Sequence, residues 1–212
     1  MSTSTLDEHA LKNSEARLFR LIEARTHPDA DVAEIDRRIW DLFGEEWAIM
    51  WTDLSGFSRQ AADFGIIHFL QVIHEQKQLL LPIVDRHDGV LIKVEADSFL
   101  LIFKRPEQAV RAAIEMQSAC QKFSERRLAN EQIILCVGVG FGRILKIGDQ
   151  DVWGEQVNAA SKLGEDTARG HEVLVTDAVV RALTPDSKFD FAPHPAVVAG
   201  SPNNHALIYR AT

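Results

Sequence analysis

Two short apolar segments near the middle of the chain constrain its fold more than any other feature. They span residues 89–94 and 98–103, and only Glu95, Ala96 and Asp97 separate them. Three residues leave room for a tight turn and nothing more, so the two segments are predicted to form an antiparallel β-hairpin. Because a lone hairpin is only marginally stable in water, other strands and helices must cover its apolar faces.

The segments around this hairpin predict an α+β fold. A strand over 47–53 and a helix within 56–87 precede the hairpin, and a helix over 106–128 and a strand over 133–141 follow it. This β-α-β-β-α-β order is that of the ferredoxin-like unit, a mixed sheet with helices packed on one face. The remaining expected elements are a helix over 155–166, a strand over 172–175, a short helix over 177–183 and C-terminal strands over 188–192 and 205–210.

The chain is expected to divide into an N-terminal helical extension, residues 1–45, and one globular domain, residues 46–212. Residues 1–9 are polar and are expected to be disordered, after which apolar side chains recur at helical spacing. Asp31, with Glu34 three residues later, is typical of the start of a second helix. The apolar stripes of these helices fit packing against the domain or against a second subunit.

Charge and composition exclude several classes of function. The chain of 212 residues has a net charge of −8 and no cluster of lysine and arginine, whereas a nucleic-acid-binding protein normally presents a basic face. No apolar run approaches the roughly 18 residues that suggest a membrane span, and the N-terminus lacks the features of a signal peptide. Cys120 and Cys136 are expected to be buried, reduced thiols. We therefore expect a cytoplasmic protein with no membrane span that does not bind nucleic acid.

Two aspartates are candidate metal ligands. Asp53 ends the first predicted strand and Asp97 lies in the hairpin turn, so both carboxylates meet if strand and hairpin are neighbours. They would repel one another unless protonated or bridged by a metal ion, and oxygen ligands of this kind favour Mg²⁺ or Mn²⁺ bound together with substrate phosphates. The Ser-Gly turn after Asp53 exposes backbone N–H groups near Gly56 and Phe57 that suit an anion. The alternative interpretation is that each aspartate only stabilises a turn.

Four further polar residues stand in informative positions. Lys93 is the one charge in an apolar strand, which is costly unless its ammonium reaches water or a partner. Asp151 precedes a predicted helix on which Asn158 and Lys162, four residues apart, share one face. Each also has a purely structural interpretation, as a lysine at a sheet edge or as a capped helix with an exposed lysine.

Three glycines alternate in the segment Val137-Gly-Val-Gly-Phe-Gly142. A dinucleotide-binding loop would lead into a helix whose N-terminus holds the pyrophosphate, but another strand is expected after this segment. We therefore expect the glycines to let a strand pass close beneath a helix.

Three segments taken together resemble the catalytic domain of class III nucleotidyl cyclases. They are Trp51-Thr-Asp53-Leu-Ser-Gly-Phe57, Lys93-Val-Glu-Ala-Asp97 and Asp151-Val-Trp-Gly-Glu-Gln-Val-Asn158, in the order and at the separations typical of that family. The resemblance covers roughly residues 46–210. It implies an adenylate cyclase, in which the ribose 3′-oxygen of ATP attacks the α-phosphorus to give cyclic AMP and pyrophosphate, with two Mg²⁺ or Mn²⁺ ions per active site.

The resemblance also implies a role for each candidate residue that binds metal or phosphate. Asp53 and Asp97, with the carbonyl oxygen of Leu54, would hold the metal ions. Gly56 and Phe57 would contact the substrate. Because the family builds its active site between two domains, a chain with one such domain implies a head-to-tail homodimer with shared active sites.

The residues that would select and process the nucleotide come from the other subunit of that dimer. Lys93 and Asp151 match the purine-selecting pair of adenylate cyclases, in which lysine donates to a ring acceptor and aspartate accepts from the exocyclic amine of adenine. Asn158 would orient the ribose, and Lys162 stands where the family usually has the catalytic arginine.

Three positions depart from the family pattern. Lys162 keeps the positive charge of the usual arginine but lacks its planar fork. Ala199 stands where a phosphate-binding lysine is common. Ala96 replaces the glycine before the metal-binding aspartate, which is harmless only if the φ angle of that residue is negative. The metal and purine sites are thus expected to be intact and the phosphate contacts weakened.

The alternative to an adenylate cyclase is a catalytically weak or silent module that binds nucleotide or a partner and signals through dimerisation. A diguanylate cyclase is excluded, because Lys93-Val-Glu-Ala-Asp97 is not the GG(D/E)EF-type hairpin of that class.

Overall fold

The structure is a computed structural model that describes residues 4–56 and 64–209, with side chains from residue 14 onward. Within these residues eight strands form one sheet in the order β2-β3-β1-β4-β6-β8-β7, and β5 pairs with β4. The strands are β1 (Gly44–Leu54), β2 (Gly89–Glu95), β3 (Ser98–Phe103), β4 (Leu135–Ile147), β5 (Asp151–Trp153), β6 (Val173–Thr176), β7 (Asp190–His194) and β8 (Asn204–Ile208).

The helices are α1 (Ser4–Arg25), α2 (Val32–Phe43), α4 (Ile66–Arg86), α5 (Pro106–Ser124), α6 (Glu155–Ser161) and α7 (Asp177–Ala182). Short helical turns follow at η1 (Ala129–Glu131), η2 (Lys162–Thr167) and η3 (Pro185–Ser187), of which η2 is π-helical. None of the described helices combines the length and apolar character that a membrane span requires.

The strand order confirms the predicted α+β fold. The hairpin β2–β3 lies beside β1 in antiparallel register, and β4 covers the other edge of β1, which is the β2-β3-β1-β4 order of a ferredoxin-like unit. β6 then pairs with β4 in parallel, so the sheet is mixed. The predicted adjacency of the first strand and the hairpin is thereby confirmed.

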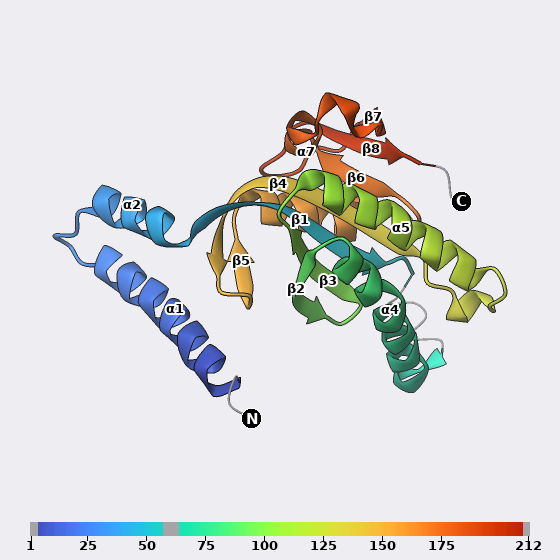
Figure 1. Ribbon diagram of the computed structural model, residues 1–212, viewed down its shortest axis with the longest axis horizontal. Helices are drawn as coiled ribbons and strands as arrows, with labels where there is room; N and C mark the ends of the chain where they lie inside the picture. The colour runs from blue at the N-terminus through green and yellow to red at the C-terminus, as the bar shows by residue number, and fades with distance from the viewer. Residues whose placement is uncertain (1–3, 57–63, 210–212) are drawn as a thin grey trace.

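The two faces of the sheet are covered differently. α4 and α5 pack on one face (Figure 1), where Met50 and Leu101 of the strands meet Met116 of α5 in the main core. On the opposite face Trp51 and Leu100 pack with Val157 of α6 in a smaller apolar cluster. Side chains alternate between the faces along each strand, so the functional residues near Trp51 and Leu100 belong to the α6 face.

The alternating glycines of β4 have the packing role expected from the sequence. A Cβ atom on Gly138 would lie 2.1 Å from the carbonyl oxygen of Ala160, and one on Gly140 would lie 2.5 Å from that of Gln156. Only glycine lets β4 pass this close beneath α6. This contact fixes α6, and the residues that follow it, directly over the sheet.

Several boundaries differ from the sequence expectation. The helix expected from about residue 10 begins at Ser4, since a polar segment carries no periodic signal of where its helix starts. The helix expected within 56–87 is described from Ile66, after Gly65 with a φ of +84°. The helix expected over 155–166 ends as an α-helix at Ser161 and continues as the π-helical turn η2.

The N-terminal helices pack on the far end of β4. Leu18 of α1 and Ile39 of α2 are buried in one cluster with Ile147. The side chain of Asp31 accepts a 3.0 Å hydrogen bond from the backbone N–H of Glu34, as the capping pattern predicts. Figure 1 shows both helices projecting to one side of the sheet, beside the β4–β5 hairpin.

Candidate active site

The end of β1 brings Asp53 and Asp97 together. Asp53 continues the alternation of Ile49 and Trp51 onto the α6 face, and Asp97 sits in the turn of the neighbouring hairpin. Burial raises the pKa of Asp97 to about 7, with a further contribution from the charge of Asp53. Burial also raises the pKa of Asp53, although a 2.9 Å hydrogen bond from the Ser98 hydroxyl opposes the shift. Because a positive charge nearby would favour ionisation of both carboxylates, their arrangement suits a bound cation.

One atom of this pair fits a divalent ion particularly well. Asp97 is 6% exposed, and its Oδ2 atom is buried without a hydrogen-bond partner among the described residues. A buried carboxylate oxygen without a partner costs free energy that a bound cation would recover. No three acidic, histidine or cysteine side chains of the described residues are placed to hold an ion together. Main-chain and substrate oxygens would therefore complete the shell, as is usual for Mg²⁺.

The turn after β1 holds the other predicted contacts of this group. Leu54 is buried at the end of β1, directly after Asp53. Gly56 lies in the turn with a φ of +83°, a left-handed conformation that favours glycine. The backbone N–H of Ser55 donates to the carbonyl oxygen of Ile134 at 2.8 Å, so that group is not available to an anion. Phe57 lies outside the described residues.

The turn of the β2–β3 hairpin is itself strained. Ala96 has a φ of +52°, in the left-handed region that a Cβ atom disfavours. The condition under which alanine would be harmless here, a negative φ, is therefore not met. The substitution of the family's glycine has a conformational cost next to Asp97.

A β-bulge orients Lys93. The register of β2 against β3 passes from Leu91–Leu101 to Lys93–Leu100, so Ile92 is an extra residue on β2. The bulge turns Lys93 onto the same face as Leu100, which is the α6 face. Without the bulge, strict alternation would place Lys93 toward α4 and α5.

Lys93 finds its partner in the short strand β5. Its Nζ atom donates a 2.8 Å hydrogen bond to Oδ2 of Asp151, and the Oδ1 atom of Asp151 accepts from the N–H of Val152 at 2.9 Å. The two side chains are 35% and 28% exposed, so both reach solvent. They line a hollow of about 200 Å³ together with Glu95 and apolar side chains, which include Trp51, Leu100 and Val157.

The four residues thus form two groups on one face of the sheet. Neither Asp53 nor Asp97 lines the hollow that holds Lys93 and Asp151. A flat base would find an acceptor, a donor and apolar walls in that hollow, which is the composition of a ligand site.

Asn158 and Lys162 lie on the exposed side of the α6–η2 segment. Asn158 is exposed on α6. Lys162 is 60% exposed and its Nζ atom pairs with Oδ2 of Asp166 at 2.6 Å. The hydrogen bond with Asp166 raises the pKa of Lys162, so this lysine carries its charge. An approaching phosphate would have to compete with Asp166.

The loop with Ala199 packs against the start of α6. The side-chain amide of Gln156 donates to the carbonyl oxygen of Gly200 at 2.9 Å. Gly200 has a φ of +83°, and a Cβ atom there would lie 2.8 Å from the carbonyl oxygen of Glu155. Ala199 is exposed in this loop and presents no charge.

Sequence reasoning missed two residues at the end of β1 that carries Asp53. Ser98 is buried and donates to Asp53, and Glu165 of η2 lies on the other side of its hydroxyl at 3.5 Å. Ser98 directly follows Asp97, which was a usable signal. Glu165 is 112 positions from Asp53 in the sequence and has no such signal, because its placement beside Ser98 depends on the π-helical turn.

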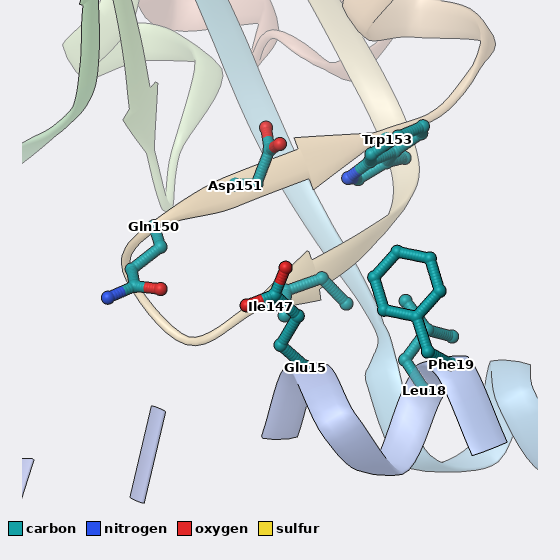
Figure 2. A pocket seen from close by; sticks show the side chains of 7 residues that line it. All are labelled: Glu15, Leu18, Phe19, Ile147, Gln150, Asp151 and Trp153. Atoms are coloured by element: carbon teal, nitrogen blue, oxygen red, sulfur yellow. The ribbon is translucent and has the colours of Figure 1, made fainter. Parts of the chain in front are cut away.

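A second cavity adjoins the residue that would read the purine. It has a volume of about 220 Å³ and lies between α1 and the β4–β5 hairpin, with Asp151 and Trp153 in its lining. Figure 2 shows Glu15, Leu18 and Phe19 projecting from α1 toward the hairpin. The N-terminal helices therefore contact the same hairpin that carries Asp151.

The comparisons with known proteins show the family of the domain that carries these residues. The family model of the adenylate and guanylate cyclase catalytic domain matches residues 44–206. The chain belongs to this family. The match includes every described candidate residue of the two groups above and begins where β1 begins.

Curated relatives and a solved structure resemble the same region. The chain is 30% identical over 145 residues to putative adenylate cyclase 3 of Rhizobium meliloti, covering 68% of this chain and 24% of that protein. It is 24% identical over 155 residues to an adenylate cyclase of Mycobacterium bovis, covering 67% and 34%. The chain thus spans well under half the length of these relatives. The crystal structure of an adenylate/guanylate cyclase/hydrolase from Silicibacter pomeroyi has a TM-score of 0.68 at 22% identity, covering 79% of this chain and 98% of that one.

Proposed function

We propose that this protein is an adenylate cyclase that converts ATP to cyclic AMP and pyrophosphate. The observation that carries the proposal is the Lys93–Asp151 pair at the edge of an apolar hollow. Adenine offers a ring nitrogen that accepts and an exocyclic amine that donates. Lys93 donates to the first and Asp151 accepts from the second, whereas the carbonyl of guanine would face Asp151 unfavourably.

Asp53 and Asp97 hold the metal ions of this site, with the carbonyl oxygen of Leu54 as a further ligand. Their raised pKa values and the buried Oδ2 atom of Asp97 support this assignment. Two Mg²⁺ or Mn²⁺ ions, when bound, supply positive charge at the triphosphate and favour ionisation of the ribose 3′-hydroxyl. This positive charge also lets a chain of net charge −8 hold a polyanion.

The remaining residues position the reacting atoms. Asn158 orients the ribose, so that the 3′-oxygen lies in line with the α-phosphorus. The O3′–P bond forms as the bond from the α-phosphorus to the pyrophosphate oxygen breaks, and the 3′-hydroxyl proton is released. Lys162 stabilises the charge that develops on the α-phosphate. Gly56 and Phe57 contribute backbone N–H groups to the phosphates.

The active site is shared in a head-to-tail homodimer, with Asp53 and Asp97 from one subunit facing Lys93, Asp151 and Asn158 of the partner subunit. An exposed apolar surface at the start of α4 supports this assembly. Ile66, Ile67 and Leu70 are 62%, 77% and 53% exposed. Exposed apolar side chains gathered in this way mark protein-binding surfaces.

A weak or silent nucleotide-binding module is the alternative, and Lys162 is the observation that favours it. Its ammonium pairs with Asp166, and Ala199, where the family commonly has a phosphate-binding lysine, carries no charge. Arginine would grip two phosphate oxygens where lysine binds as a point charge.

Cyclic AMP production by dimeric protein tests the proposal. With Mn²⁺ and saturating ATP we expect turnover that Asp53→Ala abolishes and Lys162→Arg increases by about tenfold. Gel filtration with light scattering verifies the dimer before each assay. ATP binding without turnover, unchanged in Lys162→Arg, would establish the silent module instead.

A further inference from the structure

The metal-binding end of β1 contains a third carboxylate that the family comparison does not assign. The carboxylate of Glu165 approaches Asp53 from η2, and the hydroxyl of Ser98 lies between them. The Ser98 Oγ atom is 2.9 Å from Oδ1 of Asp53 and 3.5 Å from Oε1 of Glu165. A serine hydroxyl has one proton to donate, so the two carboxylates compete for it.

The backbone holds Glu165 in this position. Gly164 rests directly on β1, because a Cβ atom there would lie 2.7 Å from the carbonyl oxygen of Trp51 and 3.0 Å from the backbone nitrogen of Gly138. The other oxygen of Glu165, Oε2, accepts a 2.6 Å hydrogen bond from the Ser161 hydroxyl. Glu165 is therefore fixed from two sides, although the residue itself is exposed.

Asp97 shows that this end of the sheet is built for a ligand. The residue is 6% exposed, and its buried Oδ2 atom lacks a hydrogen-bond partner among the described residues. The negative charge of Glu165 adds to that of the aspartates, and it contributes to the raised pKa of Asp53 after burial. Asp53 and Glu165 share the Ser98 hydroxyl, so a further negative charge lies beside the two aspartates and strengthens the attraction for a divalent cation.

We propose that Glu165 is a positioning residue of the metal site, which acts through the Ser98 hydroxyl to orient Asp53 and raises the affinity for a divalent cation. The inference rests on the proposed metal-binding role of Asp53. No three acidic, histidine or cysteine side chains of the described residues are placed to hold an ion together, so we assign Glu165 a positioning role and not that of a direct ligand. When a cation engages Asp53, Glu165 remains as an acceptor for the Ser98 hydroxyl, which therefore stays hydrogen-bonded. Partners of metal ligands typically change metal affinity by 10–100-fold.

Mn²⁺ titration without nucleotide tests the inference independently of turnover. Free Mn²⁺ is measured by electron paramagnetic resonance with the 212-residue chain at pH 8. We expect Glu165→Gln to weaken Mn²⁺ binding at least tenfold. Asp166→Asn is the matched control, since it removes the same charge one residue along, from a carboxylate that pairs with Lys162. It is expected to change the affinity less than twofold.

Two further variants separate the possible outcomes. If Ser98 carries the effect, the losses in Ser98→Ala and Glu165→Gln will be less than additive in the double variant. Additive losses, or Glu165→Gln affinity within twofold of the wild type, would overturn the inference. Asp53→Asn distinguishes this from failure of the proposed function: if it leaves Mn²⁺ binding unchanged, the metal site itself is wrongly assigned. Circular dichroism verifies that each variant is folded.

Discussion

The Nζ atom of Lys93 donates a 2.8 Å hydrogen bond to Oδ2 of Asp151, and this contact joins two strands that do not pair in the sheet. Lys93 belongs to β2 at one edge, whereas Asp151 begins β5, which pairs only with the far end of β4. The ion pair therefore holds the β4–β5 hairpin over the hollow on the α6 face. The ion pair also gives Lys93 and Asp151, the proposed purine-reading residues, a partner when no base is bound. A base that binds them must therefore replace one charged contact with two hydrogen bonds.

Reversing this ion pair should change the preference for the base. In the double variant Lys93→Glu with Asp151→Lys, the ion pair is retained but donor and acceptor exchange places. A charged hydrogen bond contributes about 1.5–3 kcal/mol, so we expect the ratio of kcat/KM for ATP over GTP to fall at least tenfold. Steady-state assays with each nucleotide measure the ratio.

A second ion pair in the same hairpin provides the control. Lys146 and Asp149 pair at 2.5 Å, and Asp149 is 69% exposed. Reversing this pair should leave the ATP over GTP ratio within twofold of the wild type. An equal change in both double variants would show that Lys93 and Asp151 do not read the purine.

Ala96→Gly should stabilise the protein. The left-handed conformation of an L-residue costs about 1–2 kcal/mol, which glycine avoids. Glycine also makes the unfolded chain more flexible, which lowers the free energy of unfolding by about 0.5–1 kcal/mol. We expect a net gain of about 0.5–1 kcal/mol in the free energy of unfolding, seen as a Tm rise of about 1–4 °C. Ala119→Gly, in the interior of α5, is the control and should lower Tm. A fall in Tm for Ala96→Gly would contradict the φ of +52°.

Metal-free protein should lose stability as the pH rises from about 4 to about 7. Native Asp97 keeps its proton until its pKa of about 7, whereas unfolded aspartate releases it near 3.9. In this window the native state binds more protons than the unfolded state, so the free energy of unfolding falls with rising pH and levels off above it. We expect Asp97→Asn to reduce this fall.

Urea unfolding in the presence of a chelator measures the difference between the two proteins. At pH 8 Asp97→Asn should be more stable than the wild type by up to about 4 kcal/mol, and near pH 4 the two should be similar. Saturating Mn²⁺ should restore the stability of the wild type at pH 8, because a ligand that binds the native state stabilises that state by mass action. Parallel pH profiles for both proteins would show that Asp97 is not the responsible group.

The adjacency of Asp53 and Asp97 was predictable because it follows from strand order alone. The short separation of the two apolar segments predicts the hairpin, and the β-α-β-β-α-β order places that hairpin beside the first strand. The close approach of β4 to α6 was likewise predictable from the glycines at Gly138 and Gly140. These features depend on local pattern and on rules of chain connection.

Contacts that depend on backbone irregularities were not predictable. The face on which Lys93 lies depends on the bulge at Ile92. No glycine or proline stands at this point of β2 or β3 to indicate a bulge in the sequence. Glu165 reaches Ser98 because η2 is π-helical, and a regular helix would place the residue at a different angle around the axis. The left-handed conformation of Ala96 was not predictable either, because alanine rarely adopts it.

Gly164→Ala should destabilise the protein and weaken its metal site together. The backbone of Gly164 is not left-handed, so the cost is steric: the new methyl group would lie 2.7 Å from the carbonyl oxygen of Trp51. That atom belongs to β1 in the centre of the sheet and cannot move away, so η2 must lift from the strand. Overpacking of this kind costs about 1–3 kcal/mol, and thermal unfolding should show a Tm lower by about 2–10 °C. Because Glu165 lifts with η2, Mn²⁺ affinity should fall in the same direction as in Glu165→Gln. A variant with a lowered Tm and wild-type Mn²⁺ affinity would show that the position of Glu165 does not matter to the metal site.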